Sequence, residues 1–110
     1  MLIATRVLKL RQTAGVVDLP IRIFTPRREG ASWFCKFEVG WPDGTLTMDA
    51  GGVDAVQALE LALKMIGAQL YASDHHASGA LVWQRPGRGY GFPVTNGIRD
   101  MLIGDDKRFL

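Results

Sequence analysis

Apolar and polar residues alternate along the first half of the chain, which is the pattern of half-buried β-strands. The alternation is loose over residues 3–11 and regular over residues 17–24, so two strands are predicted there. Pro20 lies in the second run and has no N–H to donate, which places that part of the strand at a sheet edge or beside a bulge. The charged residues 25–30 are predicted to form a solvated loop.

The clearest strand signal lies at residues 32–39. One face of this strand is apolar and holds Trp33, Cys35, Phe37 and Val39. Residues 40–44 combine a proline with Asp-Gly, which is the chemistry of a tight turn. A hairpin with a partner strand at residues 45–49 is therefore predicted, with Trp33 and Phe37 facing the core.

After Gly51-Gly52 the apolar period changes to that of a helix, which is predicted over residues 53–72 with Asp54 as its N-cap or first-turn acid. The face expected to cover the sheet holds Ala55, Val56, Leu59, Ala62, Leu63, Ile66 and Leu70. The side expected to meet water holds Gln57, Glu60, Lys64 and Tyr71. Glycine destabilises the interior of a helix relative to alanine. At Gly67, either a neighbouring segment packs closely against the helix or the last turns of the helix are loosely held.

The C-terminal third carries weaker signals. Residues 81–83 predict a short final strand, and the tail from Ile98 to Leu110 has enough apolar residues for a short helix or an apolar clasp. The predicted fold is α+β, with an antiparallel sheet of about five strands packed on one long helix in the order β-β-β-β-α-β. The tail is expected to shield part of the opposite side of the sheet.

Composition predicts a single domain over residues 1–110, because 47% hydrophobic residues can supply one continuous core. The 13 basic residues are scattered among 11 acidic ones, giving a net charge of +2. Nucleic-acid binding needs basic residues clustered on one face, so it is not indicated by the charge.

Cys35 is the only cysteine, so an intrachain disulfide is excluded, and its strand position is typical of a small buried hydrophobe. The apolar stretch before Arg6 is too short for a signal peptide, and no later run approaches a membrane span. A cytoplasmic protein without membrane attachment is therefore expected.

The sequence assigns no metal, cofactor or catalytic residue. His75 and His76 follow Asp74, but adjacent side chains diverge and a metal site needs convergent ligands, so a solvated loop is predicted. Asp49 and Asp54 are separated by a turn rather than paired for acid–base chemistry. These observations favour a noncatalytic protein.

Glycines alternate with other residues at positions 87–91, but the run lacks the spacing and the following helix of a dinucleotide-binding loop. The segment also carries two arginines beside two aromatic residues, namely Arg85, Arg88, Tyr90 and Phe92. These side chains could stack on and pair with an anionic or nucleic-acid ligand. The alternative is a structural Gly/Pro turn.

One flank of the predicted helix is apolar beyond the face that a sheet would cover, and it consists of Leu61, Met65, Ala68 and Ala72. Such a strip can mark an oligomer or partner contact, or the tail can fold over it. The leading hypothesis is a noncatalytic interaction module, including a homodimer, that uses this flank or the edge strand containing Pro20. The small anionic-ligand or nucleic-acid binder is the alternative.

Two segments carry a family resemblance: Trp33-Phe34-Cys35-Lys36-Phe37, and the run from Gly51 to Gly67 with its Gly-Gly-Val-Asp-x-x-Gln-Ala-Leu motif. They resemble a bacterial family of small domains of unknown function. The resemblance implies the α+β fold and a bacterial origin, and it assigns no catalytic residue. Small orphan domains of this kind are often interaction, immunity or accessory proteins, which is an analogy at the level of the fold.

Overall fold

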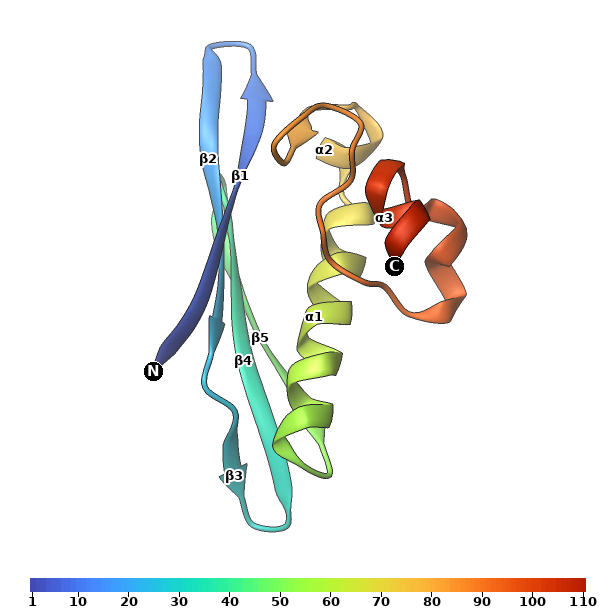
Figure 1. Ribbon diagram of the computed structural model, residues 1–110. Coiled ribbons are helices and arrows are strands. Elements are labelled where there is room, and N and C mark those ends of the chain that lie inside the picture. Colours follow the sequence, from blue (N-terminus) through green and yellow to red (C-terminus); the bar gives the residue numbers. More distant parts are fainter.

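The alternating half of the chain forms strands and the helical-period segment forms one long helix, so the predicted α+β class is confirmed. The computed structural model describes all residues from 1 to 110 (Figure 1). Its elements are β1 Leu2–Gln12, β2 Gly15–Phe24, β3 Arg27–Glu29, β4 Ser32–Trp41, β5 Gly44–Gly52, α1 Ala55–Tyr71, α2 Asp74–Ala77, β6 Leu81–Val82, η1 Asn96–Met101 and α3 Gly104–Phe109.

All strands belong to one antiparallel sheet in which β4 is central. On one side β4 pairs with β5 along its whole length, from Trp33 opposite Gly52 to Trp41 opposite Gly44. On its other side it pairs with β3 and then β2, and the sheet continues through β1 to the short β6. The predicted hairpin is confirmed, since Pro42 and Asp43 alone connect β4 to β5.

Pro20 lies where the contact between β2 and β4 ends. The two strands pair only from Ile21 to Ile23, and a Cβ on Gly40 would lie 2.8 Å from Cγ of Pro20. Because proline cannot donate to the ladder, the half of β2 before it pairs with β1 alone. This half of the strand is the predicted edge.

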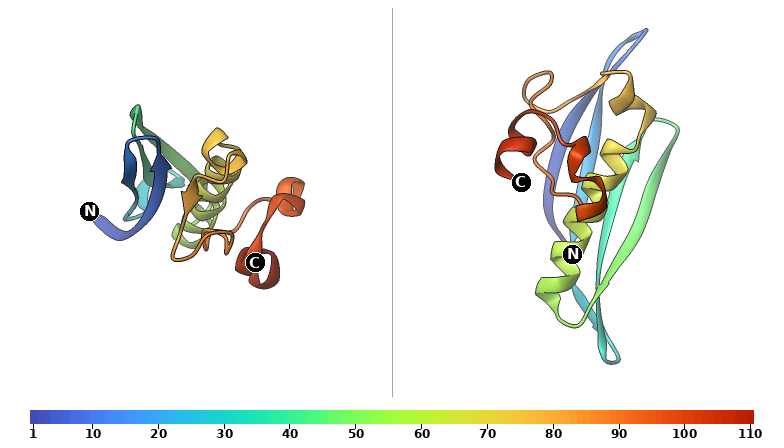
Figure 2. Two further views of the ribbon diagram at one scale, coloured as in Figure 1. Left: turned by 90° about the horizontal axis from the view of Figure 1, so that it is seen from above. Right: turned by 90° about the vertical axis from the view of Figure 1, so that its right-hand side faces the viewer.

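The core lies between one face of the sheet, made by β1, β2, β4 and β5, and the layer of α1 with residues 90–102 that covers it (Figures 1 and 2). Its fully buried side chains include Cys35, Phe37, Val39, Ile66 and Leu70. Each large apolar side chain buried in this way contributes roughly 1.5–3 kcal/mol. The thiol of Cys35 packs as the expected small hydrophobe, and burial raises its pKa.

The start of α1 is fixed by capping and by a close approach to β5. Asp54 Oδ1 accepts from Gln57 N at 2.8 Å, and Gln57 Oε1 accepts from Val53 N at 2.8 Å, which confirms Asp54 as the N-cap. A Cβ on Gly52 would lie 2.5 Å from the backbone N of Ala58. Glycine at this position lets the end of β5 touch the first turn of the helix.

The C-terminal segment, by which we mean residues 83–110, packs on α1 rather than on the far face of the sheet. The predicted shielding of the far face by the tail is therefore wrong. A Cβ on Gly67 would lie 1.9 Å from the carbonyl oxygen of Pro93, so the chain crosses the helix backbone there. Figure 2 shows three layers, with α1 between the sheet and the C-terminal segment. The far face carries ion pairs such as Arg27–Asp49 at 2.9 Å, together with aromatic side chains such as Phe34, whose ring lies against Arg27.

Two positions on α1 and the loop at residues 25–30 also differ from the prediction. Tyr71 was expected in water, yet it is 1% exposed because the C-terminal segment covers it. Val56 was expected in the core, yet it is 72% exposed, because it lies in the first turn on the side turned away from the sheet. Residues 27–29 of the predicted loop form β3, which pairs with Ser32–Phe34 across a two-residue turn.

Candidate interaction surface

The strand β5 pairs with β4 on one side only, so its other edge is unpaired over all nine residues. This outer edge lies next to α1. No backbone hydrogen bond joins β5 to any segment except β4. Natural edge strands are usually protected by lysine, proline, a bulge or short length. The nine residues of β5 contain neither lysine nor proline, and they pair with β4 without a bulge. Its one charged side chain, Asp49, is paired with Arg27 at 2.9 Å. This edge therefore lacks the lysine, proline and bulge that usually oppose pairing with another strand.

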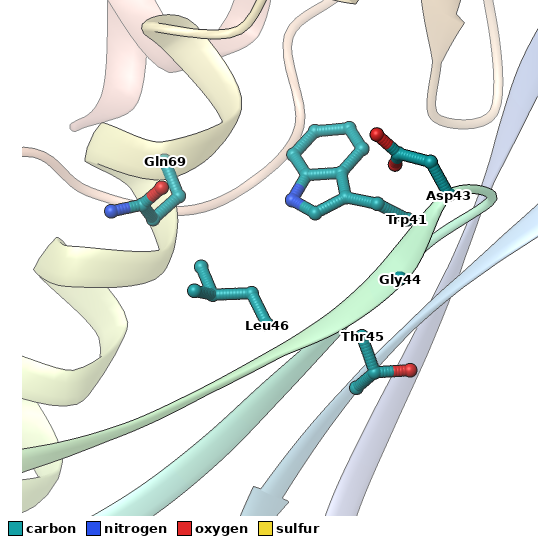
Figure 3. A pocket seen from close by; sticks show the side chains of 6 residues that line it. All are labelled: Trp41, Asp43, Gly44, Thr45, Leu46 and Gln69. Atoms are coloured by element: carbon teal, nitrogen blue, oxygen red, sulfur yellow. The ribbon is translucent and has the colours of Figure 1, made fainter.

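A shallow hollow of about 380 Å³ opens beside the start of β5 (Figure 3). It is lined by Trp41, Asp43, Gly44, Thr45, Leu46 and Gln69. The side chains of Trp41 and Leu46 point into the space between the sheet and α1, toward Gln69. The Gln69 side chain also bridges helix and strand, because its Nε2 donates to Sδ of Met48 at 3.8 Å.

The apolar flank adjoins this hollow. Leu61, Met65 and Gln69 are spaced by four residues, so they form one stripe along α1 on the side of β5. Leu61 and Met65 are half-buried against the core, Ala68 is half-buried, and Ala72 is exposed. Gly67 and Met65 are about 160° apart around the helix, so the crossing chain at Gly67 leaves the Met65 side open. The role of the flank as an interface stays a prediction.

We use the term β5 surface for the outer edge of β5, the hollow beside it, and the flank at Leu61 and Met65.

The two histidines lie in the short helix α2 rather than in a solvated loop, which corrects the prediction. The ring of His75 stacks on Trp41 with centroids 5.3 Å apart. Nδ1 of His76 lies 2.5 Å from Oη of Tyr90, and its ring packs edge-on against Tyr71. Partial burial lowers the pKa of His76. Both rings therefore take part in packing, and no cluster of three potential metal-binding side chains surrounds them.

The structure separates the four candidate ligand-binding residues into two groups. Tyr90 and Phe92 are buried in the core. Arg85 and Arg88 are exposed at a hollow of about 220 Å³, where Arg88 pairs with Asp105 at 2.8 Å. The cation that contacts the ring of Phe92 is Arg6, with its Cζ 4.8 Å from the centroid. Whether the two arginines bind a ligand is not tested by this arrangement.

The carboxyl group of Asp106 is the main feature that sequence reasoning missed. It is 2% exposed and accepts three hydrogen bonds: from Oη of Tyr71 at 2.6 Å, from N of Tyr90 at 2.7 Å, and from N of Gly91 at 2.8 Å. The glycine-rich segment thus wraps around an anion supplied by the chain itself. The only signal in the sequence was the alternation of glycines, which permits this close approach.

The groups around Asp106 are held in defined charge states. Burial raises the pKa of Tyr90 to about 12, and the negative charge of Asp106 makes a smaller contribution to this increase. Burial also raises the pKa of Tyr71, and the hydrogen bond to Asp106 adds to this shift. Nη1 of Arg6 donates to the carbonyl oxygens of Tyr90 and Gly91 at 3.2 and 2.9 Å. Both phenols are therefore neutral at neutral pH, and that of Tyr71 donates to Asp106.

Comparison with known proteins identifies a family without an assigned activity. Residues 4–94 match the model of the family described as domain of unknown function DUF6968. No curated protein and no solved structure matches the chain. None of the helices has the length and apolar character needed to cross a membrane. Because the match covers most of the chain, the protein belongs to the DUF6968 family of domains of unknown function.

Proposed function

We propose that this protein is a noncatalytic interaction module whose partner is a second copy of the same chain, joined along the β5 surface. The observation that carries the proposal is the unpaired outer edge of β5, which has no lysine, proline or bulge over nine residues. An edge of this kind presents unpaired N–H and C=O groups to another strand.

Two-fold symmetry suits this edge. Two copies of β5 related by a two-fold axis run antiparallel, so each edge is the complement of the other. The two sheets then form one continuous sheet with both α1 helices on the same face. Since Leu61 and Met65 lie on the β5 side of α1, the apolar flank of each copy faces that of the other.

The other edge that the sequence predicts as an interface is in β2, and it is better protected against pairing with another strand. Only the half of β2 before Pro20 lacks a second partner, and Pro20 ends it. Proline disfavours edge pairing, and β5 contains none, so β5 is the preferred interface.

The test is the solution mass by light scattering over a concentration series. We expect the wild type to be a dimer and Leu61→Glu with Met65→Glu to be a folded monomer, because four carboxylates would meet across the axis. Val53→Glu with Val56→Glu is the matched control, since both valines are exposed and apolar but lie outside the β5 surface. A wild type that is monomeric at every concentration would refute the dimer.

A second variant tests the strand edge without touching the core. Thr47 is exposed on β5 opposite Glu38, so Thr47→Lys gains a partner within the monomer. On an edge strand the same lysine opposes pairing. We expect Thr47→Lys to shift the protein toward monomer and the uncharged Thr47→Val to remain dimeric. Equal masses for the two variants would argue against the β5 edge.

A small anionic-ligand or nucleic-acid binder is the second candidate, because Arg85 and Arg88 share one hollow. Binding of an anionic ligand should be lost in Arg88→Ala and should weaken with salt. The pairing of Arg88 with Asp105 competes with such a ligand. Binding that Arg88→Ala leaves unchanged would remove this candidate.

A further inference from the structure

We propose that Tyr71, Tyr90 and Gly91 form a carboxylate-binding site, which the side chain of Asp106 occupies as a tethered ligand. The ligand class is a carboxylate with a short apolar stem, of the kind that acetate represents. The proposal does not rest on the dimer, because the site lies on the side of α1 that the C-terminal segment covers.

The donor set is the first argument. The phenol of Tyr71 and the N–H of Tyr90 both reach Oδ2 of Asp106, and the N–H of Gly91 reaches Oδ1. All three groups donate, and an ionised carboxylate offers only acceptors. Since Tyr71 is 1% exposed, its hydroxyl has no access to water as a substitute. The site therefore selects an anion with two oxygen atoms over a neutral group.

The shape of the backbone is the second argument. Gly89 and Gly91 have φ values of +88° and +74°, in the region that favours glycine. A Cβ on Gly89 would lie 2.5 Å from Cγ of Asp106. Glycine thus lets the main chain approach the carboxylate where any other residue would collide with it.

The third argument is the polarity of the Tyr90–Gly91 peptide group. Its N–H points at the carboxylate of Asp106, while its carbonyl oxygen accepts from Nη1 of Arg6 at 3.2 Å. The peptide dipole is therefore aligned between a cation and an anion, which strengthens both hydrogen bonds. Arg6 supplies positive charge without touching the ligand, so this site needs no exposed basic residue.

The occupant belongs to a different part of the chain from the site. Every donor lies within residues 4–94, which the family model matches, whereas Asp106 lies beyond them. Asp106 is carried by α3, a helix of six residues in which Asp106 alone is buried. Residues 95–97, which lead toward it, are exposed. A helix this short has little stability of its own, so its position depends on tertiary contacts such as the hydrogen bonds to Asp106 and the one from Asp105 N to the carbonyl oxygen of Arg88 at 2.9 Å.

The test uses the full-length chain with Asp106→Gly, because acetate has the atoms that this substitution removes. We expect the midpoint of thermal unfolding to fall by about 10 °C, since three buried donors lose their acceptor. About 100 mM acetate should then raise the midpoint by about 5 °C if it binds at roughly 10 mM. Acetamide and chloride at equal concentrations should not.

Asp105→Gly is the matched control, because Asp105 is the neighbouring residue of α3 and forms only an exposed ion pair. It loses the same charge and the same helix propensity, and we expect no specific response to acetate. Adding Tyr71→Phe to Asp106→Gly should weaken the acetate response, since one donor is gone. A response of equal size in Asp105→Gly, or none in Asp106→Gly, would overturn the proposal.

If Asp106→Gly is unfolded in chloride, the readout becomes the folded fraction by circular dichroism in acetate, and failure to recover structure counts against the site. Asp106→Asn provides a further check that is independent of added ligand. The asparagine amide presents either an N–H donor or a weaker acceptor to the three donors from Tyr71, Tyr90 and Gly91. Asp106→Asn should therefore lower the stability of the protein more than Asp105→Asn does. Equal stability of the two variants would show that the site has no preference for a carboxylate.

Discussion

At the scale of single residues, several glycines lie where separate parts of the chain touch, and three of them join different layers of the fold. Gly52 meets the backbone of α1, Gly67 meets the backbone at Pro93, and Gly89 meets the carboxyl group of Asp106. At each position a Cβ would come within 2.5 Å of another heavy atom. Glycine at these sites is required by tertiary packing rather than by turn geometry alone.

Gly67→Ala gives a direct test of the contact between α1 and the C-terminal segment. A Cβ 1.9 Å from the carbonyl oxygen of Pro93 must push the segment away. This overpacking should outweigh the roughly 1 kcal/mol that alanine gains over glycine within a helix. We expect a net loss of about 2 kcal/mol in the free energy of unfolding, measured by denaturant titration.

Gly97→Ala is the control for this substitution, because nothing lies within 4 Å of a Cβ at that position. It should change stability by less than about 0.5 kcal/mol. A Gly67→Ala protein more stable than the wild type would mean that the segment does not cross the helix at this point.

At the scale of elements, α1 is covered on two sides rather than one. Its sheet-facing side follows the apolar period, with Ala58, Ala62 and Ile66 fully buried. Its outer side is partly covered by the segment that crosses at Gly67, which buries Tyr71. The short α2 then places His76 against Tyr71 and Tyr90, so one small cluster joins three parts of the chain.

This cluster predicts a pH dependence of stability. Burial lowers the pKa of His76 below its ordinary value near 6.5, so the unfolded chain binds a proton more readily than the folded one. Stability is therefore complete above about pH 7 and falls as pH drops through roughly 6.5. The expected loss is small, because His76 is only half-buried and its ring is partly solvated.

The measurement is the thermal midpoint of the wild type, His76→Gln and His75→Gln between about pH 7.5 and pH 5.5. Glutamine can form a hydrogen bond with the Tyr90 hydroxyl, as donor or as acceptor, without taking up a proton. His76→Gln should lose this part of the pH dependence, and His75→Gln should keep it. Identical profiles for all three proteins would assign the effect to another group.

At the scale of the whole molecule, the layers divide the surface into separate regions. The molecule is elongated, with extents of 46 × 28 × 19 Å, and its far sheet face carries ion pairs such as Arg27–Asp49. The β5 surface lies on one side of α1, and the carboxylate site lies under the segment that covers the other. The solution mass and the acetate response therefore test the two proposals separately.

The parts of the fold that could be predicted are those set by local patterns. Alternation located the long strands but not the short β3, Asp-Gly located the hairpin turn, and Asp54 located the start of the helix. The path of the C-terminal segment could not be predicted, because its apolar residues have no regular period and its glycines permit many conformations. For the same reason, a tyrosine on a polar-looking helix face was assigned to water, although it is buried.

The candidate site was predictable to a similar extent. The flank at Leu61 and Met65 follows from helical spacing alone, and the structure places it beside β5. The lack of protection along β5 becomes visible only when the strand order is known, since sequence does not say which strand is at the edge. The pairing of Arg88 with Asp105 and the burial of Tyr90 likewise depend on contacts across long separations.

The sequence by itself determined the long strands, the long helix and its cap, and the α+β class, because each depends on residues close together in the chain. Tertiary structure alone decided that α1 is the middle layer, that β5 is an unpaired edge, and that Asp106 enters the core. The physical reason is that a buried carboxylate is tolerated only where donors from distant segments converge on it. That convergence of Tyr71, Tyr90 and Gly91 exists only after the chain has folded.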